Sequence, residues 1–166
     1  MNTLIRLEEA TDREAIFLLT KRAFAPMPFA AGDEQELVNA LRDAGVLSLS
    51  LVAEQDGQII GHLALSPATH IGGGNGWFGL GPISVEPAHQ RKGLGGALIA
   101  EAITWLRARG ASGVILTGDP NYYARQGFRS APAHAPEDEP AEYFMVLPLA
   151  GAVPAGRFGF HPAFSG

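Results

Sequence analysis

The chain of 166 residues is long enough to bury one hydrophobic core without help from metals or disulfides. Hydrophobic residues make up 46% of it and charged residues 17%, a balance that excludes a disordered chain and a long solvated coiled coil. A formal charge of -5 argues against a surface that binds phosphate backbones, so we expect no nucleic-acid partner. The absence of cysteine excludes thiol nucleophiles, Cys-based zinc sites and disulfides.

The N-terminal residues place Arg6, Glu8 and Glu9 among apolar side chains, so they lack the apolar core of a signal peptide. No apolar run in the sequence is long enough to span a bilayer. We therefore expect a cytoplasmic protein without a membrane partner.

The first elements predicted are a strand at residues 4–7 and a helix capped by Thr11 or Asp12. The Pro26/Pro28 pair is expected to end this helix. Four apolar residues are predicted to lie on one side of it: Ile16, Leu18, Leu19 and Ala23.

A second helix and a β-hairpin are predicted next. Asp33 is expected to cap the helix, which stops at Gly45. Residues 47–54 and 58–66 are apolar-rich strand candidates, and the Asp56-Gly57 step between them is a strong hairpin signal.

The middle of the chain predicts a change from antiparallel to parallel strands. A glycine-rich loop at residues 72–76 precedes a strand at 77–85. A helix over residues 94–109 follows, and then a short buried strand at 114–117. The order strand, helix, strand predicts a right-handed parallel crossover.

The last quarter of the chain predicts a short helix, a strand and a tail. Pro120 fits the first turn of the helix, which Gly127 ends. A Pro/Ala/acidic loop at residues 131–140 precedes a final strand at 142–147. The Gly/Pro-rich tail at 151–166 carries three phenylalanines and is expected to pack on the body of the protein.

The segment from Gln90 to Gly96 has the properties of an anion site. Glycines at 93, 95 and 96 leave the backbone bare where the strand turns into a helix, so several N–H groups can point at one anion. The helix dipole adds attraction, and Arg91 and Lys92 can supply charge to the same oxygens. A diphosphate fits this pattern. The alternative is a tight turn into a well-packed helix with a solvated basic pair.

Two other glycine-rich motifs are incomplete here, which disfavours a nucleotide-binding domain. A Walker A loop ends in Gly-Lys-Ser/Thr, whereas this chain has Gly95-Gly96-Ala97. A dinucleotide fingerprint needs a third Gly or Ala where Leu98 stands, and an acidic residue in the apolar neighbourhood of Ile115.

Residues 80–99, LGPISVEPAHQRKGLGGALI, resemble the strand and Gln/Arg-x-x-Gly-x-Gly/Ala loop of the GNAT superfamily of acyl-CoA-dependent N-acyltransferases. The later motif YYARQGF at residues 122–128 occurs in the order and spacing of that family. The combination of Gly118-Asp119-Pro120 with Tyr122-Tyr123 looks closest to a bacterial subgroup of predicted N-acetyltransferases. The acceptors of that subgroup are mostly unassigned.

The resemblance implies an α/β fold with three α/β/α layers and a mixed, mainly antiparallel central sheet that is splayed between its fourth and fifth strands. The domain is expected to comprise residues 1–150, with the tail at 151–166 packed on it. The resemblance also implies acetyl-CoA as acyl-donor co-substrate, without a metal. The acetyl group would pass by direct attack to a primary amine of a small-molecule or peptide acceptor, in a monomer or homodimer.

The family's site can be carried over to matching positions. The pantetheine arm would pair with the main chain of Ile83, Ser84 and Val85, and the Val85 N–H would stabilise the oxyanion. Further contacts with the donor are expected from nine residues: Gln90, Arg91, Lys92, Gly93, Leu94, Gly95, Gly96, Tyr123 and Arg125.

Tyr123 stands four residues before Gly127, where many family members keep a tyrosine near the departing sulfur. A phenol has a pKa of about 10 and a thiol a pKa of about 8.5. A tyrosine can therefore protonate a departing thiolate if the site reduces this difference in pKa. We therefore expect Tyr123 to be the general acid. The alternative is a half-buried structural tyrosine, a role that fits Tyr122 better.

The attacking amine must lose a proton, and the sequence leaves its acceptor open. Glu86 directly follows the strand and is assigned here as a catalytic residue, while Glu54, His62 and His70 are further candidates. The acceptor pocket is expected in the segments 24–32 and 69–77 and in the tail.

A non-catalytic acyl-CoA-binding or sensing module is the main alternative function. Such a module would keep the glycine loop but lose the acid and the acceptor pocket. The presence of Tyr123 favours the enzyme.

Overall fold

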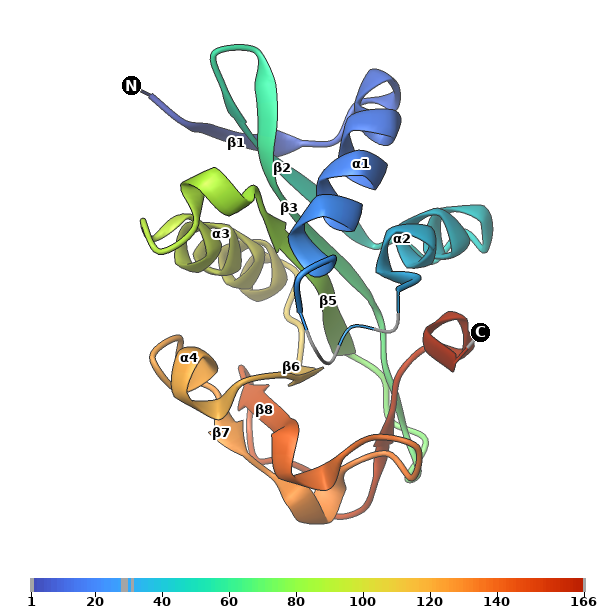
Figure 1. The fold of residues 1–166 in the computed structure, drawn as a ribbon. Coiled ribbons are helices and arrows are strands. Elements are labelled where there is room, and N and C mark those ends of the chain that lie inside the picture. Colours follow the sequence, from blue (N-terminus) through green and yellow to red (C-terminus); the bar gives the residue numbers. More distant parts are fainter. Residues whose placement is uncertain (1, 28–29, 31, 166) are drawn as a thin grey trace. The chain divides into compact units, whose positions relative to one another are not determined.

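The computed structural model describes residues 2–27, 30 and 32–165, so Pro28, predicted to help end the first helix, lies outside the described residues (Figure 1). The chain forms two compact units. Unit 1 comprises residues 1–65 and 81–102, and unit 2 comprises residues 66–80 and 103–166.

Unit 1 contains the N-terminal strands and helices, and two strands and one helix are divided between it and unit 2. These elements are β1 (Leu4–Leu7), α1 (Arg13–Phe24), α2 (Glu34–Asp43), β2 (Leu49–Gln55), β3 (Gln58–Pro67), the second half of β5 (Trp77–Val85) and the first part of α3 (Leu94–Ala108). Strand β2 pairs antiparallel with both β1 and β3. The predicted hairpin is confirmed, because Asp56 and Gly57 take the positive φ angles of 52° and 76° that a tight β-turn of this kind needs.

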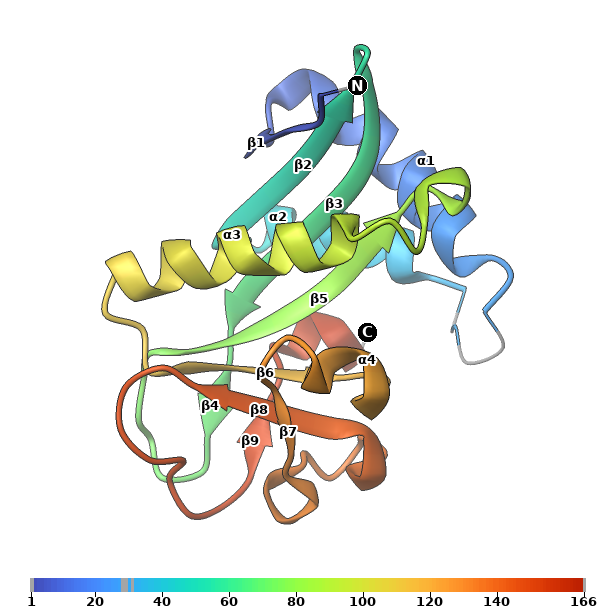
Figure 2. The same ribbon diagram turned by 90° about the vertical axis from the view of Figure 1, so that its left-hand side faces the viewer.

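Helices lie on both faces of the strands of unit 1. Figures 1 and 2 show α1 and α2 on one face of β2 and β3, and α3 on the other. Ile16, Val38 and Val52 form a core cluster on the first face. On the second face, Gly61 permits close approach of α3, because a Cβ there would lie 3.1 Å from Leu98 Cδ1 and 3.2 Å from Leu94 Cδ2.

Unit 2 contains the C-terminal strands, the first part of β5 and a short helix. The further elements are β4 (Thr69–His70), β6 (Gly113–Thr117), α4 (Pro120–Ala124), β7 (Arg129–Ser130), β8 (Phe144–Pro148) and β9 (Phe158–Gly159). Strand β6 is parallel to β5, which confirms the parallel pairing expected of the crossover, and antiparallel to β8. The strand order is β1-β2-β3-β5 in unit 1 and β5-β6-β8-β7 in unit 2, so β5 is common to both parts of a seven-stranded mixed sheet. The predicted α/β fold with a mainly antiparallel sheet is confirmed.

The pairing of β5 with β6 is short. Trp77 pairs with Gly113, and the register ends two residues later with Gly79 opposite Ile115. These are the fourth and fifth strands of the sequence prediction, because the two-residue β4 was not predicted. The register thus covers only the first three residues of β5, all of them in unit 2.

The tail belongs to the core of unit 2. Phe158 is 3% exposed and packs in one cluster with Trp77 and Phe144. Its strand β9 pairs antiparallel with β4. The pairing of two such short strands depends on contacts distant in sequence, which is why local pattern did not predict them.

Two capping predictions are confirmed in position only, and one prediction of burial is wrong. Asp12 and Asp33 occupy N-cap positions, but neither side chain makes a capping hydrogen bond. The Asp12 carboxylate instead accepts hydrogen bonds from Arg6 and from the Glu9 N–H. Leu18, predicted on the apolar side of α1, is 44% exposed.

None of the described helices has the length and hydrophobicity required to cross a membrane.

Candidate functional site

At the end of β5, one edge of the strand has main-chain N–H and C=O groups that do not pair with β3. The Glu86 N–H donates to the Ile60 carbonyl at 2.8 Å, so the main chain of Glu86 is directed toward β3. Because successive residues of a strand direct their N–H and C=O groups to opposite sides, those of Val85 and Ile83 are directed away from β3. The Val85 carbonyl accepts a hydrogen bond from Gln90 Nε2 at 3.1 Å. By the same alternation the main chain of Ser84 faces β3, so Val85 and Ile83 fit the predicted main-chain contacts better than Ser84.

The segment Gln90 to Gly96 forms a concave turn of backbone N–H groups. Arg91 and Gly93 take left-handed conformations with φ of 64° and 85°, and α3 begins at Leu94. The first donor of the helical ladder is the Ala97 N–H, which bonds to the Gly93 carbonyl at 3.1 Å. For the N–H groups of residues 91–96, the described backbone provides no hydrogen-bond acceptor. Successive N–H groups in left-handed and helical conformations form an anion-binding concavity.

The side chains of this loop add positive charge at its rim. Arg91 and Lys92 are exposed, and neither makes an ion pair with the part of the chain that the structure describes. The Gln90 amide binds the end of β5 and therefore fixes the loop to the strand that carries Val85. Unit 1 thus brings together the predicted residues from Ile83 to Gly96.

Tyr123 lies on α4 in unit 2. Asp119 caps this helix through a 3.0 Å bond to the Asn121 N–H, and Pro120 occupies its first turn. The Tyr123 ring contacts the rings of Tyr122 and Phe128 at centroid distances of 4.9 and 5.9 Å. Arg125, the other predicted donor contact of unit 2, places its guanidinium 5.7 Å from the centre of the Tyr122 ring.

The electrostatic surroundings of Tyr123 keep its phenol protonated. Burial raises the pKa of Tyr123 well above its ordinary value, and Tyr122 and Asp119 raise it further. A general acid matched to the thiolate would have a pKa lowered toward that of a thiol, whereas the pKa of Tyr123 is raised. Tyr123 therefore holds its proton throughout the neutral range and is available as a hydrogen-bond donor.

Gly118 sets the position of the Tyr123 ring. A Cβ at residue 118 would overlap the ring edge at Tyr123 Cε2. We expect Gly118→Ala to displace the ring and to lower the free energy of unfolding by about 1–3 kcal/mol, the usual cost of overpacking. NMR signals of the Phe128 ring should shift, because it contacts Tyr123.

Gly74→Ala is the matched control, since a Cβ at residue 74 meets nothing within 4 Å. Unchanged Phe128 signals and stability in Gly118→Ala would show that the ring is not held by this contact.

Three candidates for the base have their side chains engaged. The Glu86 carboxylate accepts three hydrogen bonds from Arg22, at 2.7, 3.1 and 3.2 Å. Glu54 accepts two from Arg6, at 2.7 and 3.0 Å. In unit 2, His70 Nδ1 accepts the Gly72 N–H at 3.0 Å, and the ring lies 4.8 Å from that of Phe158. Sequence reasoning did not identify Arg22 as a partner, since only the fold brings residues 22 and 86 together.

The fourth candidate, His62, is fully buried in unit 1. Its side chain lies on β3 and is 0% exposed. His62 Nε2 is 2.7 Å from Ser50 Oγ, and Nδ1 has no hydrogen-bond partner among the described residues. Burial lowers the pKa of His62 to about 4, so the imidazole is neutral at pH 7.

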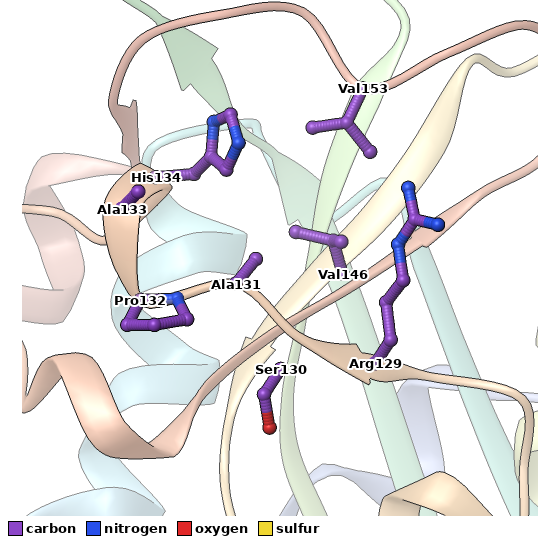
Figure 3. Close-up of a pocket in the computed structure, with 8 residues that line it drawn as sticks. All are labelled: Arg129, Ser130, Ala131, Pro132, Ala133, His134, Val146 and Val153. Carbon is purple, nitrogen blue, oxygen red and sulfur yellow. The ribbon is translucent and has the colours of Figure 1, made fainter.

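A cavity of about 280 Å³ lies in unit 2 beside β7, β8 and the short 3-10 helix Pro132–His134. Figure 3 shows Arg129, His134 and Val153 around it, while Ser130 points away from these side chains. None of the residues predicted for donor binding or catalysis lines this cavity. Val153 belongs to the tail, one of the segments predicted for the acceptor pocket. Among the described residues, no group of three or more His, Asp or Glu could hold a metal ion.

Residues 13–129 match the sequence model of the acetyltransferase (GNAT) family. The uncharacterised N-acetyltransferase YhbS of Escherichia coli K12 is 37% identical over 132 residues, which make up 79% of this chain and 76% of YhbS. The uncharacterised N-acetyltransferase YjhQ of the same strain is 34% identical over 129 residues, which make up 70% of this chain and 71% of YjhQ.

One similar solved structure is a GNAT family acetyltransferase from Brucella melitensis in complex with acetyl-CoA. It is 43% identical, has a TM-score of 0.88 and matches over 98% of both chains. The crystal structure of Escherichia coli YhbS in complex with CoA is 33% identical by structural alignment and has a TM-score of 0.89. That match covers 99% of this chain and 93% of YhbS.

Proposed function

Because the chain belongs to the acetyltransferase (GNAT) family, we propose that it transfers the acetyl group of acetyl-CoA to a primary amine of a small-molecule or peptide acceptor. The observation that carries this proposal is the loop of residues 91–96, whose N–H groups have no acceptor in the described backbone. The solved relatives with bound acetyl-CoA and CoA support the choice of donor.

The loop is the proposed grip on the pyrophosphate of the donor. The N–H groups at the start of α3 supply hydrogen bonds and the positive end of the helix dipole. The exposed side chains of Arg91 and Lys92 supply positive charge beside the loop, where they can contact phosphate oxygens of the donor. The phosphates themselves do not react, so this binding energy serves to position the thioester.

The proposed reaction is direct attack of the neutral amine on the thioester carbonyl. The Val85 N–H is directed away from β3 and is the proposed donor to the carbonyl oxygen as negative charge develops on it. Ile83 presents its main chain on the same edge and is the proposed partner of the pantetheine arm. No covalent intermediate on the protein is required.

Tyr123 is the proposed hydrogen-bond donor to the departing thiolate. Its raised pKa means that the proton is always present for this bond. Full transfer of the proton to sulfur is uphill from such a phenol, so stabilisation of the thiolate by hydrogen bonding is its main contribution.

Catalysis by Glu86 stays a prediction. Its carboxylate already accepts three hydrogen bonds from Arg22, which joins α1 to the segment before the loop. The cytoplasmic location and the monomeric or dimeric state also stay predictions.

Acetyl-CoA binding and turnover together test the proposed function. Calorimetry should show that acetyl-CoA binds, and release of free CoA should follow when a suitable amine from a panel of polyamines, amino-acid amides and peptides is added. Tight binding with no CoA release across the panel would favour the non-catalytic sensing module. Absence of acetyl-CoA binding would contradict both functions.

A further inference from the structure

A chain of buried polar side chains runs through unit 1 from Glu8 to His62. The Ser50 hydroxyl donates to Glu8 Oε1 at 2.8 Å and lies 2.7 Å from His62 Nε2. Glu8 is also bound by the Arg42 guanidinium, at 2.5 and 3.2 Å. The side chains of Glu8 and Arg42 are 11% and 13% exposed, so this end of the chain reaches solvent.

The hydrogen bonds define where the proton of His62 resides. Ser50 has one hydroxyl proton, and it is given to Glu8. The short contact with Ser50 therefore requires His62 Nε2 to be the donor. A neutral imidazole carries one N–H, so Nδ1 holds a free lone pair.

His62 lies on β3, which is the neighbour in the sheet of β5, the strand that ends in Val85. The bond from the Glu86 N–H to the Ile60 carbonyl sets the local register of β5 against β3. Two residues inward on each strand, Ser84 and His62 are opposite each other with their side chains on one face. Ser84 Oγ and His62 Nδ1 are both buried, and neither has a hydrogen-bond partner in the described chain. A hydroxyl donor and an imidazole acceptor on adjacent strands are thus both unsatisfied, and they do not hydrogen-bond to each other directly.

The surroundings of His62 disfavour its charged form. Burial is the main cause of its lowered pKa; Glu8 acts in the opposite direction, and Arg42 on α2 lowers the pKa further. A proton that arrives at Nδ1 is therefore accommodated most easily when the proton on Nε2 leaves at the same time, which keeps the ring neutral.

We propose that Ser84, His62 and Ser50 form a proton relay that carries a proton from the acceptor amine to Glu8. In this relay, which rests on the proposed function, the amine passes its proton to the Ser84 hydroxyl, which gives its own proton by way of one bridging water to His62 Nδ1. His62 gives its Nε2 proton to Ser50, and Ser50 gives its hydroxyl proton to Glu8. His62 ends as the neutral Nδ1–H tautomer, and Glu8 releases the proton to solvent.

His62→Gln separates a relay from a structural hydrogen bond. The glutamine amide can still donate to Ser50, but it cannot accept one proton while releasing another. With the best amine of the panel, we expect kcat at pH 7 to fall by about 10²-fold, the usual contribution of general base catalysis. The deficit should shrink as the pH rises, because more of the amine is then neutral before it binds. A structural defect would lower kcat equally at every pH.

Ser50→Ala should reproduce the loss, and Ser50→Thr, which restores the hydroxyl, should recover most of it. Ser48→Ala is the matched control, because among the described residues the Ser48 hydroxyl bonds only to the Val46 carbonyl, at 3.5 Å. Acetyl-CoA affinity, measured by calorimetry, should be the same in all four variants.

A kcat of His62→Gln within twofold of wild type, or a deficit that is constant with pH, overturns the relay and leaves the proposed function intact. Absence of transfer by the wild type to any amine removes both. One measurement needs no turnover: nitrogen NMR of the resting protein should show His62 protonated at Nε2. A proton found on Nδ1 contradicts the relay whatever the activity.

Discussion

Tyr123→Phe is expected to lower kcat for acetyl transfer by about 10²-fold and to leave the affinity for acetyl-CoA unchanged. The phenyl ring keeps the edge contacts with Tyr122 and Phe128, so the helix should remain in place. Only the hydroxyl that donates to the departing thiolate is removed. Steady-state rates of CoA release and calorimetric titration with acetyl-CoA measure the two quantities.

Tyr122→Phe provides the control, because it removes a hydroxyl from the adjacent residue of the same short helix. Its kcat should stay within about threefold of wild type. Equal losses in the two variants would indicate that α4 tolerates neither change, and an unaffected Tyr123→Phe would remove Tyr123 from the reaction.

Gly93→Asp should weaken acetyl-CoA binding tenfold or more. Residue 93 has a φ of 85° and lies at the centre of the loop of free N–H groups. A carboxylate there places a negative charge beside the proposed position of the pyrophosphate, and two like charges near a protein surface repel by roughly 4 kcal/mol at about 4 Å. Isothermal titration calorimetry gives the change in Kd.

Gly73→Asp matches this variant in charge and in backbone conformation, since Gly73 has a φ of 81°. Both glycines are exposed, and a Cβ added at either position would meet no atom within 4 Å. Gly73→Asp should bind acetyl-CoA as the wild type does. The turnover of acetyl-pantetheine, which lacks the pyrophosphate, should be equal in Gly93→Asp and wild type. A Kd that is unaffected in Gly93→Asp would place the phosphates elsewhere.

The main strands and helices follow from local pattern. Apolar-rich runs and the Asp56-Gly57 turn predicted the β2–β3 hairpin, and the strand, helix, strand order predicted the parallel pairing of β6 with β5. The ends of elements were less accurate. The final strand was expected from residue 142, but Ala141–Tyr143 form a 3-10 turn and β8 begins at Phe144. The local sequence pattern cannot show where a helix or strand ends because tertiary contacts replace its regular hydrogen bonds.

The loop was predictable because its function depends on backbone groups that adjacent glycines expose. The partners of the acidic and basic side chains were not predictable. Arg22 and Glu86 are 64 residues apart in sequence, and Ser50 and Glu8 are 42 apart. His62 appeared among the candidates for the base, but its burial and its contact with Ser50 result from the antiparallel register of β2 and β3.

The proposed reaction is direct acetyl transfer from acetyl-CoA to an amine. One reaction containing the wild-type protein, acetyl-CoA and an amine identified in the panel tests it, with free CoA and acetylated amine both measured by mass spectrometry. Equal amounts of the two products are expected, and the intact mass of the protein should not change when acetyl-CoA is present without the amine. CoA release without acetylated amine, or a stable acetylated protein in the absence of amine, would contradict the account.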